Sequence, residues 1–165
     1  MTDSEFSRPL RVEPLPRDGL EMEIEADATE REKLAALNGL PAISRLSAHF
    51  VVTKWRRGVE VEGELSARVT QTCVVTLEPF EVDIEEPIDV RFLPGAPADS
   101  LEEDAPDPLV DGKIDLGAIT SEFLTLALDP YPRKPGVAFE PPSEGDDPET
   151  AFSRLRALAA RDEPD

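Results

Sequence analysis

Residues 59–70 read VEVEGELSARVT, and this stretch decides the fold. Apolar residues occupy one parity, whereas three glutamates and one arginine occupy the other. Such a period of two is typical of a strand with one buried and one solvated face. The pair Arg57-Gly58 directly before it predicts a hairpin tip. The apolar positions are Val59, Val61, Leu65, Ala67 and Val69.

The same alternation extends in both directions along the chain. It runs through LEMEIEA at residues 20–26 and through FEVDIEEPIDVRF at residues 80–92. We therefore expect an antiparallel sheet formed mainly by residues 20–26 and 47–92. The sheet is predicted to be strongly curved or partly closed into a barrel.

Helical signals separate and follow these strands. A short helix is predicted at residues 29–38, with Thr29 and Glu32 as its capping box and Gly39 as its stop. A second is predicted at 115–127, capped by Asp115, and a third at 148–161. The fold class is α+β, with two or three short helices covering the sheet. The apolar stripe of the second helix is predicted as Leu116, Ile119, Phe123 and Leu126.

Proline and acidic residues mark the predicted domain organisation. Residues 1–139 are expected to form a single α+β domain, interrupted near 94–112 by a disordered acidic loop. Residues 140–165 are expected to form an acidic linker and the short C-terminal helix.

The chain is strongly acidic, with 17 basic against 36 acidic residues and a net charge of −19. Because affinity for nucleic acid comes mainly from Lys and Arg, most of this surface should repel RNA and attract basic proteins. No apolar run approaches the roughly 20 residues that span a bilayer, and no secretory signal is visible. We expect a cytoplasmic protein without membrane contacts.

The sequence contains no recognisable catalytic constellation. Phosphate-binding glycine loops are absent, and the only histidine, His49, and the only cysteine, Cys73, lie in separate segments. His49 fits a strand histidine with a local partner. We therefore expect no enzymatic activity, no bound metal and no cofactor.

A basic island interrupts the acidic background at residues 42–70. This segment has five basic residues and three glutamates, so its net charge is +2. Trp55 lies among these cations, as a stacking contact to RNA requires. The alternative, which we favour, is a structural hairpin tip with Trp55 buried and its cations paired to glutamates on the next strand. The residues of the candidate contact surface are Arg45, Lys54, Trp55, Arg56, Arg57 and Arg68.

The single cysteine occurs in QTCVVTLEPFE, residues 71–81. Cys73 has the parity of Val69 and is expected to be a small core residue. Because a proline in mid-sheet lacks a ladder donor, residues 74–80 should connect two strands, with Leu77 tucked beneath the connection.

Two segments together give a family resemblance. One is Cys73-Val-Val-Thr76-Leu77-Glu78-Pro79, and the other runs from Asp115 through Glu122 to LTLALDP. In this order the chain resembles the YceD-like family, known as large ribosomal RNA subunit accumulation proteins. Thr76 stands where many relatives have a second cysteine, so a zinc or disulfide role cannot be carried over. The family-motif positions are Cys73, Thr76, Leu77, Glu78, Pro79, Asp115 and Glu122.

The resemblance implies a non-enzymatic role in ribosomal RNA accumulation or large-subunit assembly. The acidic charge favours a basic ribosomal or assembly protein as the partner. The alternative is direct binding of ribosomal RNA through the Lys54–Arg57 hairpin. The sequence does not predict the oligomeric state.

Overall fold

The structure is a computed structural model that describes residues 5–98 and 105–138. The chain divides into two compact units, Met1–Pro135 and Gly136–Asp165. Every described helix and strand belongs to the first unit. The predicted third helix at residues 148–161 lies outside the described residues.

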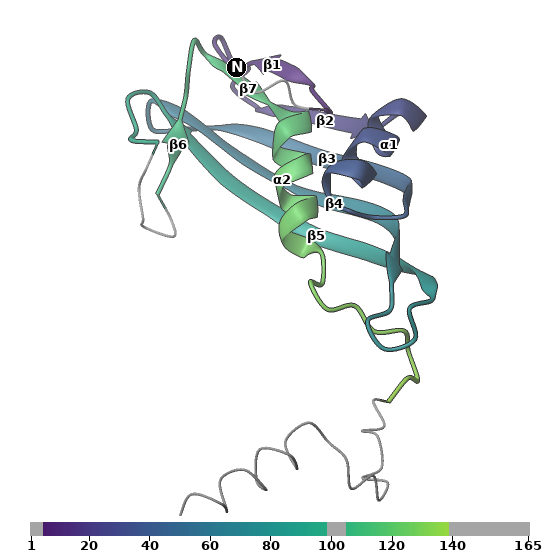
Figure 1. Ribbon diagram of the computed structural model, residues 1–165. Helices are drawn as coiled ribbons and strands as arrows, with labels where there is room; N and C mark the ends of the chain where they lie inside the picture. Colours follow the sequence, from purple (N-terminus) through teal and green to yellow (C-terminus); the bar gives the residue numbers. More distant parts are fainter. Residues whose placement is uncertain (1–4, 99–104, 139–165) are drawn as a thin grey trace, which may run out of the picture. The chain divides into compact units, whose positions relative to one another are not determined.

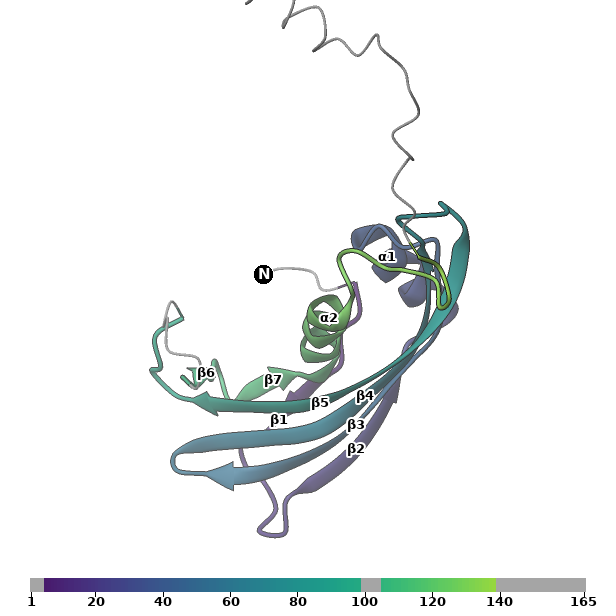
Figure 2. The same ribbon diagram turned by 90° about the horizontal axis from the view of Figure 1, so that it is seen from below.

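The main sheet has five strands in the order β2-β3-β4-β5-β6 (Figure 1). Its pairs are antiparallel except for β5 and β6, which run parallel. Figure 2 shows a strongly curved sheet with both helices on its concave side. The predicted α+β class with a curved antiparallel sheet is confirmed, and the sheet is open rather than closed into a barrel. The strands are β2 (Leu20–Glu25), β3 (Ala42–Trp55), β4 (Gly58–Thr72), β5 (Pro79–Leu93) and β6 (Asp107–Pro108).

A second, two-stranded sheet pairs β1 (Pro9–Arg11) with β7 (Lys113–Asp115). It joins the N-terminal segment to the start of helix α2 (Leu116–Ala127). Helix α1 (Ala28–Leu37) connects β2 to β3. No helix among residues 5–98 and 105–138 is long and apolar enough to cross a membrane.

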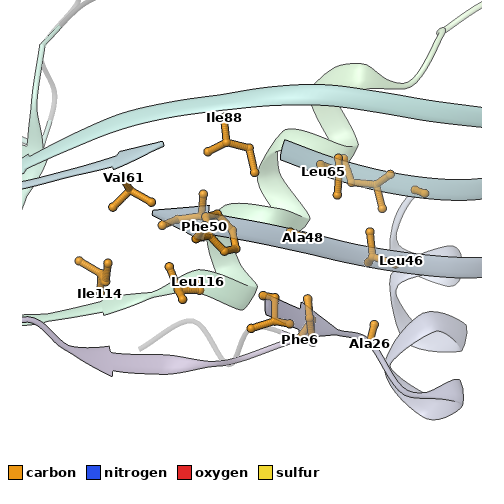
Figure 3. Packing of buried hydrophobic residues seen from close by; sticks show 14 of the residues in the cluster. Phe6, Ala26, Leu46, Ala48, Phe50, Val61, Leu65, Ile88, Ile114 and Leu116 are labelled. Atoms are coloured by element: carbon orange, nitrogen blue, oxygen red, sulfur yellow. The ribbon is translucent and has the colours of Figure 1, made fainter. Parts of the chain in front are cut away.

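The core lies on the concave face of the sheet. All five apolar positions of β4 that the alternation predicts are buried. Figure 3 shows the side chain of Phe50 close to that of Leu116, and Phe6 and Leu65 belong to the same buried cluster, so the N-terminal segment and α2 complete this core. Burial of one such large apolar side chain contributes about 1.5–3 kcal/mol to stability.

Close contact between β3 and β4 depends on Gly63. A Cβ atom at this position would lie 2.2 Å from the carbonyl oxygen of His49. Only glycine therefore permits this close approach of β4 to β3 within the curved sheet.

Two helix details differ from the sequence predictions. The capping box of α1 uses Asp27 and Glu30 rather than Thr29 and Glu32, because β2 ends early enough for Asp27 to be the extended cap residue. In α2, Leu124 is buried, whereas Leu126 is 74% exposed. Leu124 continues the buried row of Leu116 and Thr120 at intervals of four residues, whereas Leu126 lies at the exposed side of the helix, beside the groove next to β5.

The predicted disordered loop at 94–112 is wrong for residues 105–112. Strand β6 pairs with Phe92 and Leu93, and the Leu109 N–H donates to the Leu93 carbonyl at 3.1 Å. Leu109 is buried at 7% exposure. The hydrogen bonds and the burial of Leu109 offset the loss of conformational entropy on ordering this segment. The acidic composition alone gave no sign of these interactions. Residues 99–104 lie outside the described part of the chain.

The start of α2 yields a test of this packing. We predict that Gly117→Ala lowers the free energy of unfolding by about 1–3 kcal/mol, because the new Cβ would lie 2.6 Å from the carbonyl oxygen of Phe6. Urea denaturation followed by circular dichroism measures the change. Helix propensity alone predicts the opposite sign, so a stabilised variant would show that Phe6 does not lie against α2.

Candidate interaction surfaces

The convex face of the main sheet carries rows of carboxylates. Residues paired directly across antiparallel strands project to the same side, so the register defines each row. Glu62 lies between Val51 and Asp89, and Glu64 lies between His49 and Pro87. We call this carboxylate-rich side the outer acidic face. Its acidic residues are Glu21, Glu23, Glu25, Glu60, Glu62, Glu64, Glu81, Asp83, Glu85 and Asp89.

Two arginine–carboxylate ion pairs and one histidine contact involve only part of this face. The Arg68 guanidinium donates to both carboxylate oxygens of Asp83 at 2.7 and 3.0 Å, which lowers the pKa of Asp83. His49 contacts Glu21 at 2.7 Å, and Arg91 contacts Glu60 at 2.8 Å. Within the described chain no ion pair reaches the remaining members of the face, which leaves a band of uncompensated negative charge. These members are Glu23, Glu25, Glu62, Glu64, Glu81, Glu85 and Asp89.

The predicted basic island forms the tip of the β3–β4 hairpin. Trp55 is half-buried, and the Arg56 guanidinium lies 4.4 Å from the centre of its ring. Arg91 of β5 lies 5.6 Å from the same ring. Lys54 and Arg57 are exposed. The tryptophan is thus held by two arginines, in contacts typical of cation–π pairs.

The structure splits the six candidate contact residues into two groups. Arg45 and Arg68 face each other across β3 and β4. Arg68 lies ten residues beyond Gly58 along β4, and a strand rises about 3.3 Å per residue, so this pair is roughly 30 Å from the hairpin tip. Arg91 could not be assigned to the tip from sequence, because its proximity depends on the register that places it opposite Glu60.

Cys73 is fully buried at the end of β4, in agreement with the predicted core position. Its sulfur accepts the Lys134 N–H at 3.4 Å. This hydrogen bond, together with those from the hydroxyl and backbone of Thr76, lowers the pKa of the Cys73 thiol to about 6. Thr76, the last residue of the C-x-x-T motif, therefore serves as a hydrogen-bond donor to the sulfur.

The residues after α2 pack against the same turn. Gln71 donates to the Asp129 carbonyl at 3.1 Å, and the Val74 N–H donates to the Pro132 carbonyl at 2.9 Å. The Lys134 ammonium contacts Glu78 at 3.2 Å. The turn of the first motif and the segment following the second motif thus form one structural unit, which no local sequence pattern indicates.

The prediction that Leu77 is tucked beneath the turn is wrong. Its side chain is 76% exposed, and its backbone adopts φ +58°. A left-handed residue is required here because the chain must reverse between Cys73 and Pro79, where β5 begins. That conformation directs the leucine outward.

The two acidic motif positions have different surroundings. Asp115 caps α2, accepting from the Gly117 and Ala118 N–H groups at 3.0 and 3.1 Å. It also accepts the Arg8 N–H at 2.7 Å, which ties the N-terminal segment to the helix. Glu122 is exposed and lines a groove of about 490 Å³ between α2 and β5. The motif positions therefore do not converge on one site.

His49 and Cys73 lie far apart, and the side-chain contact of His49 is the one to Glu21. His49 lies opposite Glu64, nine residues before Cys73 along β4, which places the two roughly 30 Å apart. Within residues 5–98 and 105–138, no group of three or more His, Cys, Asp and Glu side chains could hold a metal ion.

Comparison with known proteins gives one match. The model of the family "Large ribosomal RNA subunit accumulation protein YceD" matches residues 61–159, more than half of the chain. The chain therefore belongs to the YceD family. No curated protein and no solved structure matches it.

Cys73 gives a pH-dependent prediction. Because its pKa falls from 9.0 to about 6 in the folded protein, the unfolded state binds more protons between these values. The thiolate's contribution to stability is complete above pH 9 and is lost as the pH falls through 6. We predict that Cys73→Ser loses more stability, relative to the unchanged protein, at pH 9 than at pH 6. Urea titrations at pH 6, 7.5 and 9 measure this difference, and an equal loss at all three would contradict a thiolate role.

Leu77 gives a second prediction. Leu77→Asn should raise the free energy of unfolding by about 1 kcal/mol, because asparagine tolerates the left-handed conformation and the exposed leucine makes little packing contribution. Thermal denaturation checks the sign. A destabilised variant would indicate that the leucine packs against the protein after all.

Proposed function

We propose that this protein supports large-subunit ribosomal RNA accumulation without catalysing a reaction, by binding a basic ribosomal or assembly protein. The family match supports the connection to ribosomal RNA. The outer acidic face carries the proposal, since it is a continuous surface of exposed carboxylates with few neutralising partners. Ribosome assembly would place this activity in the cytoplasm.

Charge complementarity explains why a protein partner is favoured. A surface with net negative charge repels the RNA backbone and speeds encounter with a basic protein. Basic ribosomal proteins bind ribosomal RNA through the same positive charges. A carboxylate surface can therefore hold such a protein until RNA displaces it.

The proposal predicts a specific loss of binding. Glu62→Lys with Glu64→Lys should reduce capture of basic proteins from the native organism at physiological salt, because both side chains are exposed at the centre of the outer acidic face. The variant Asp18→Lys with Glu32→Lys has the same net charge and alters exposed residues elsewhere, so it should capture normally. Mass spectrometry of proteins and sequencing of RNA identify what is recovered. Recovery of ribosomal RNA without any basic protein would overturn the proposal.

Direct RNA binding is the second candidate, and the hairpin tip favours it. Lys54 and Arg57 are exposed beside the arginine-stacked Trp55. If the tip binds RNA, Arg56→Glu with Arg57→Glu should abolish that binding and reduce its salt dependence. Gel-shift titrations at 50 and 200 mM salt test this, and unchanged binding would assign the tip a structural role.

A further inference from the structure

The edge of β5 is the longest unpaired strand edge in the described part of the chain. Strand β6 covers only Phe92 and Leu93 of this strand, although β5 begins at Pro79. Among residues 5–98 and 105–138, no strand therefore pairs with residues 81–90 on this side. Such an edge is a template for an added strand.

The backbone groups that face the open edge can be identified. The Leu93 carbonyl accepts from Leu109, so it points toward β6. Since alternate residues of a strand direct their backbone groups to the same edge, those of Glu81, Asp83, Glu85 and Asp89 also point outward. Pro87 has this parity and lacks an N–H, as expected for a proline at an open edge.

The side chains along this edge are acidic and belong to the outer acidic face. Glu81, Asp83, Glu85 and Asp89 are exposed carboxylates, whereas Arg91, which shares their parity, pairs with Glu60. A second copy of β5 would align carboxylate with carboxylate, which is unfavourable. A strand with lysine or arginine at the matching positions would instead place opposite charges side by side.

The other side of the edge offers apolar contacts. The groove lies at the C-terminal part of β5, where residues 89–92 line it together with α2 and with residues 97, 98 and 105–107. Its apolar lining includes Val90, Phe92, Ile119, Phe123 and Leu126. Leu126 is 74% exposed and Phe123 is partly exposed. An added strand alternates its side chains between the two faces, so its second set would lie on this concave side.

We propose that the edge of β5 binds an extended, basic segment of the partner protein as an additional antiparallel or parallel strand. The segment has basic residues facing the carboxylates of β5 and apolar residues facing the groove beside α2. This inference rests on the proposed function, because it specifies how that function's basic partner is held. Main-chain hydrogen bonds supply affinity, and the alternating side chains supply selectivity.

The test uses the full chain and a synthetic peptide of alternating lysine and valine. On binding, amide exchange should slow at Glu81, Asp83, Glu85 and Asp89, whose N–H groups face the open edge. At a peptide concentration ten times the dissociation constant, the slowing is about tenfold. Even-numbered amides of β5 face β4 and should change little. Site-resolved hydrogen exchange by NMR measures both sets, and peptide binding without protection of the odd-numbered amides would overturn the inference.

Two matched variants separate backbone pairing from charge. Glu85→Ala removes the carboxylate, whereas Glu85→Pro also removes the outward N–H. The proline variant should bind the peptide roughly three- to tenfold more weakly than the alanine variant, as expected for one lost hydrogen bond. Equal affinities would contradict strand addition. If the proline variant fails to fold, the hydrogen-exchange experiment on the unmutated protein tests strand addition instead.

The groove is tested from the peptide side. A lysine–serine peptide keeps the charge and backbone but loses the apolar side chains, and it should bind at least about tenfold more weakly. Leu126→Ser should reduce affinity for the lysine–valine peptide and leave that for the lysine–serine peptide unchanged. Equal binding of both peptides would remove the groove from the proposal.

Failure of this inference is distinguishable from failure of the proposed function. A peptide that binds the outer acidic face without protecting the β5 edge leaves the function standing and overturns strand addition. A glutamate–valine peptide and a single-stranded RNA should not protect the edge, and protection by either would also overturn it. If the protein captures ribosomal RNA but no basic protein from the native organism, the proposed function is overturned, whether or not the peptide binds.

Discussion

The continuous pairing of β4 with β3 and β5 is the constraint on which the rest of this structure depends. The 15-residue β4 pairs along its length with β5 and lies beside β3 on its other edge. Because the side-chain period of a strand is two, a slip by one residue would exchange the apolar and acidic faces. One register therefore fixes both the core and the outer acidic face.

The helices and the N-terminal segment close the concave side of this sheet. Asp115 caps α2 and binds the Arg8 backbone, while the Arg8 side chain contacts Glu30 of α1 at 2.7 and 2.9 Å. The two helices are thus linked through one arginine that belongs to neither. The family match begins at residue 61, so these N-terminal contacts support the matched region from outside it.

Features set by neighbouring residues could be predicted from the sequence. The alternation in β4 and the Asp115 cap are local, and both were predicted correctly. The cap of α1 was not, because Asp27 with Glu30 and Thr29 with Glu32 both have suitable spacing. The choice between them depends on where β2 leaves the sheet.

Features set by long-range pairing could not be predicted. Arg91 reaches Trp55 only through the register of β4 and β5, and Lys134 reaches Cys73 across 61 residues of sequence. Leu77 was assigned to the interior because it is apolar, but the backbone of the turn directs it outward. The groove beside α2 likewise depends on which helical face the sheet buries.

The outer acidic face also affects how molecules of this protein behave toward one another. At neutral pH, like charges keep the exposed edges of β5 apart, so the carboxylates act as colloidal stabilisers. The isoelectric point is about 4.3, within the range where carboxyl groups take up protons. Near that pH the repulsion disappears, and the unpaired edge becomes available for contact between identical chains. The carboxylates of the outer acidic face thus keep molecules of this protein apart only in solutions where these groups are ionised.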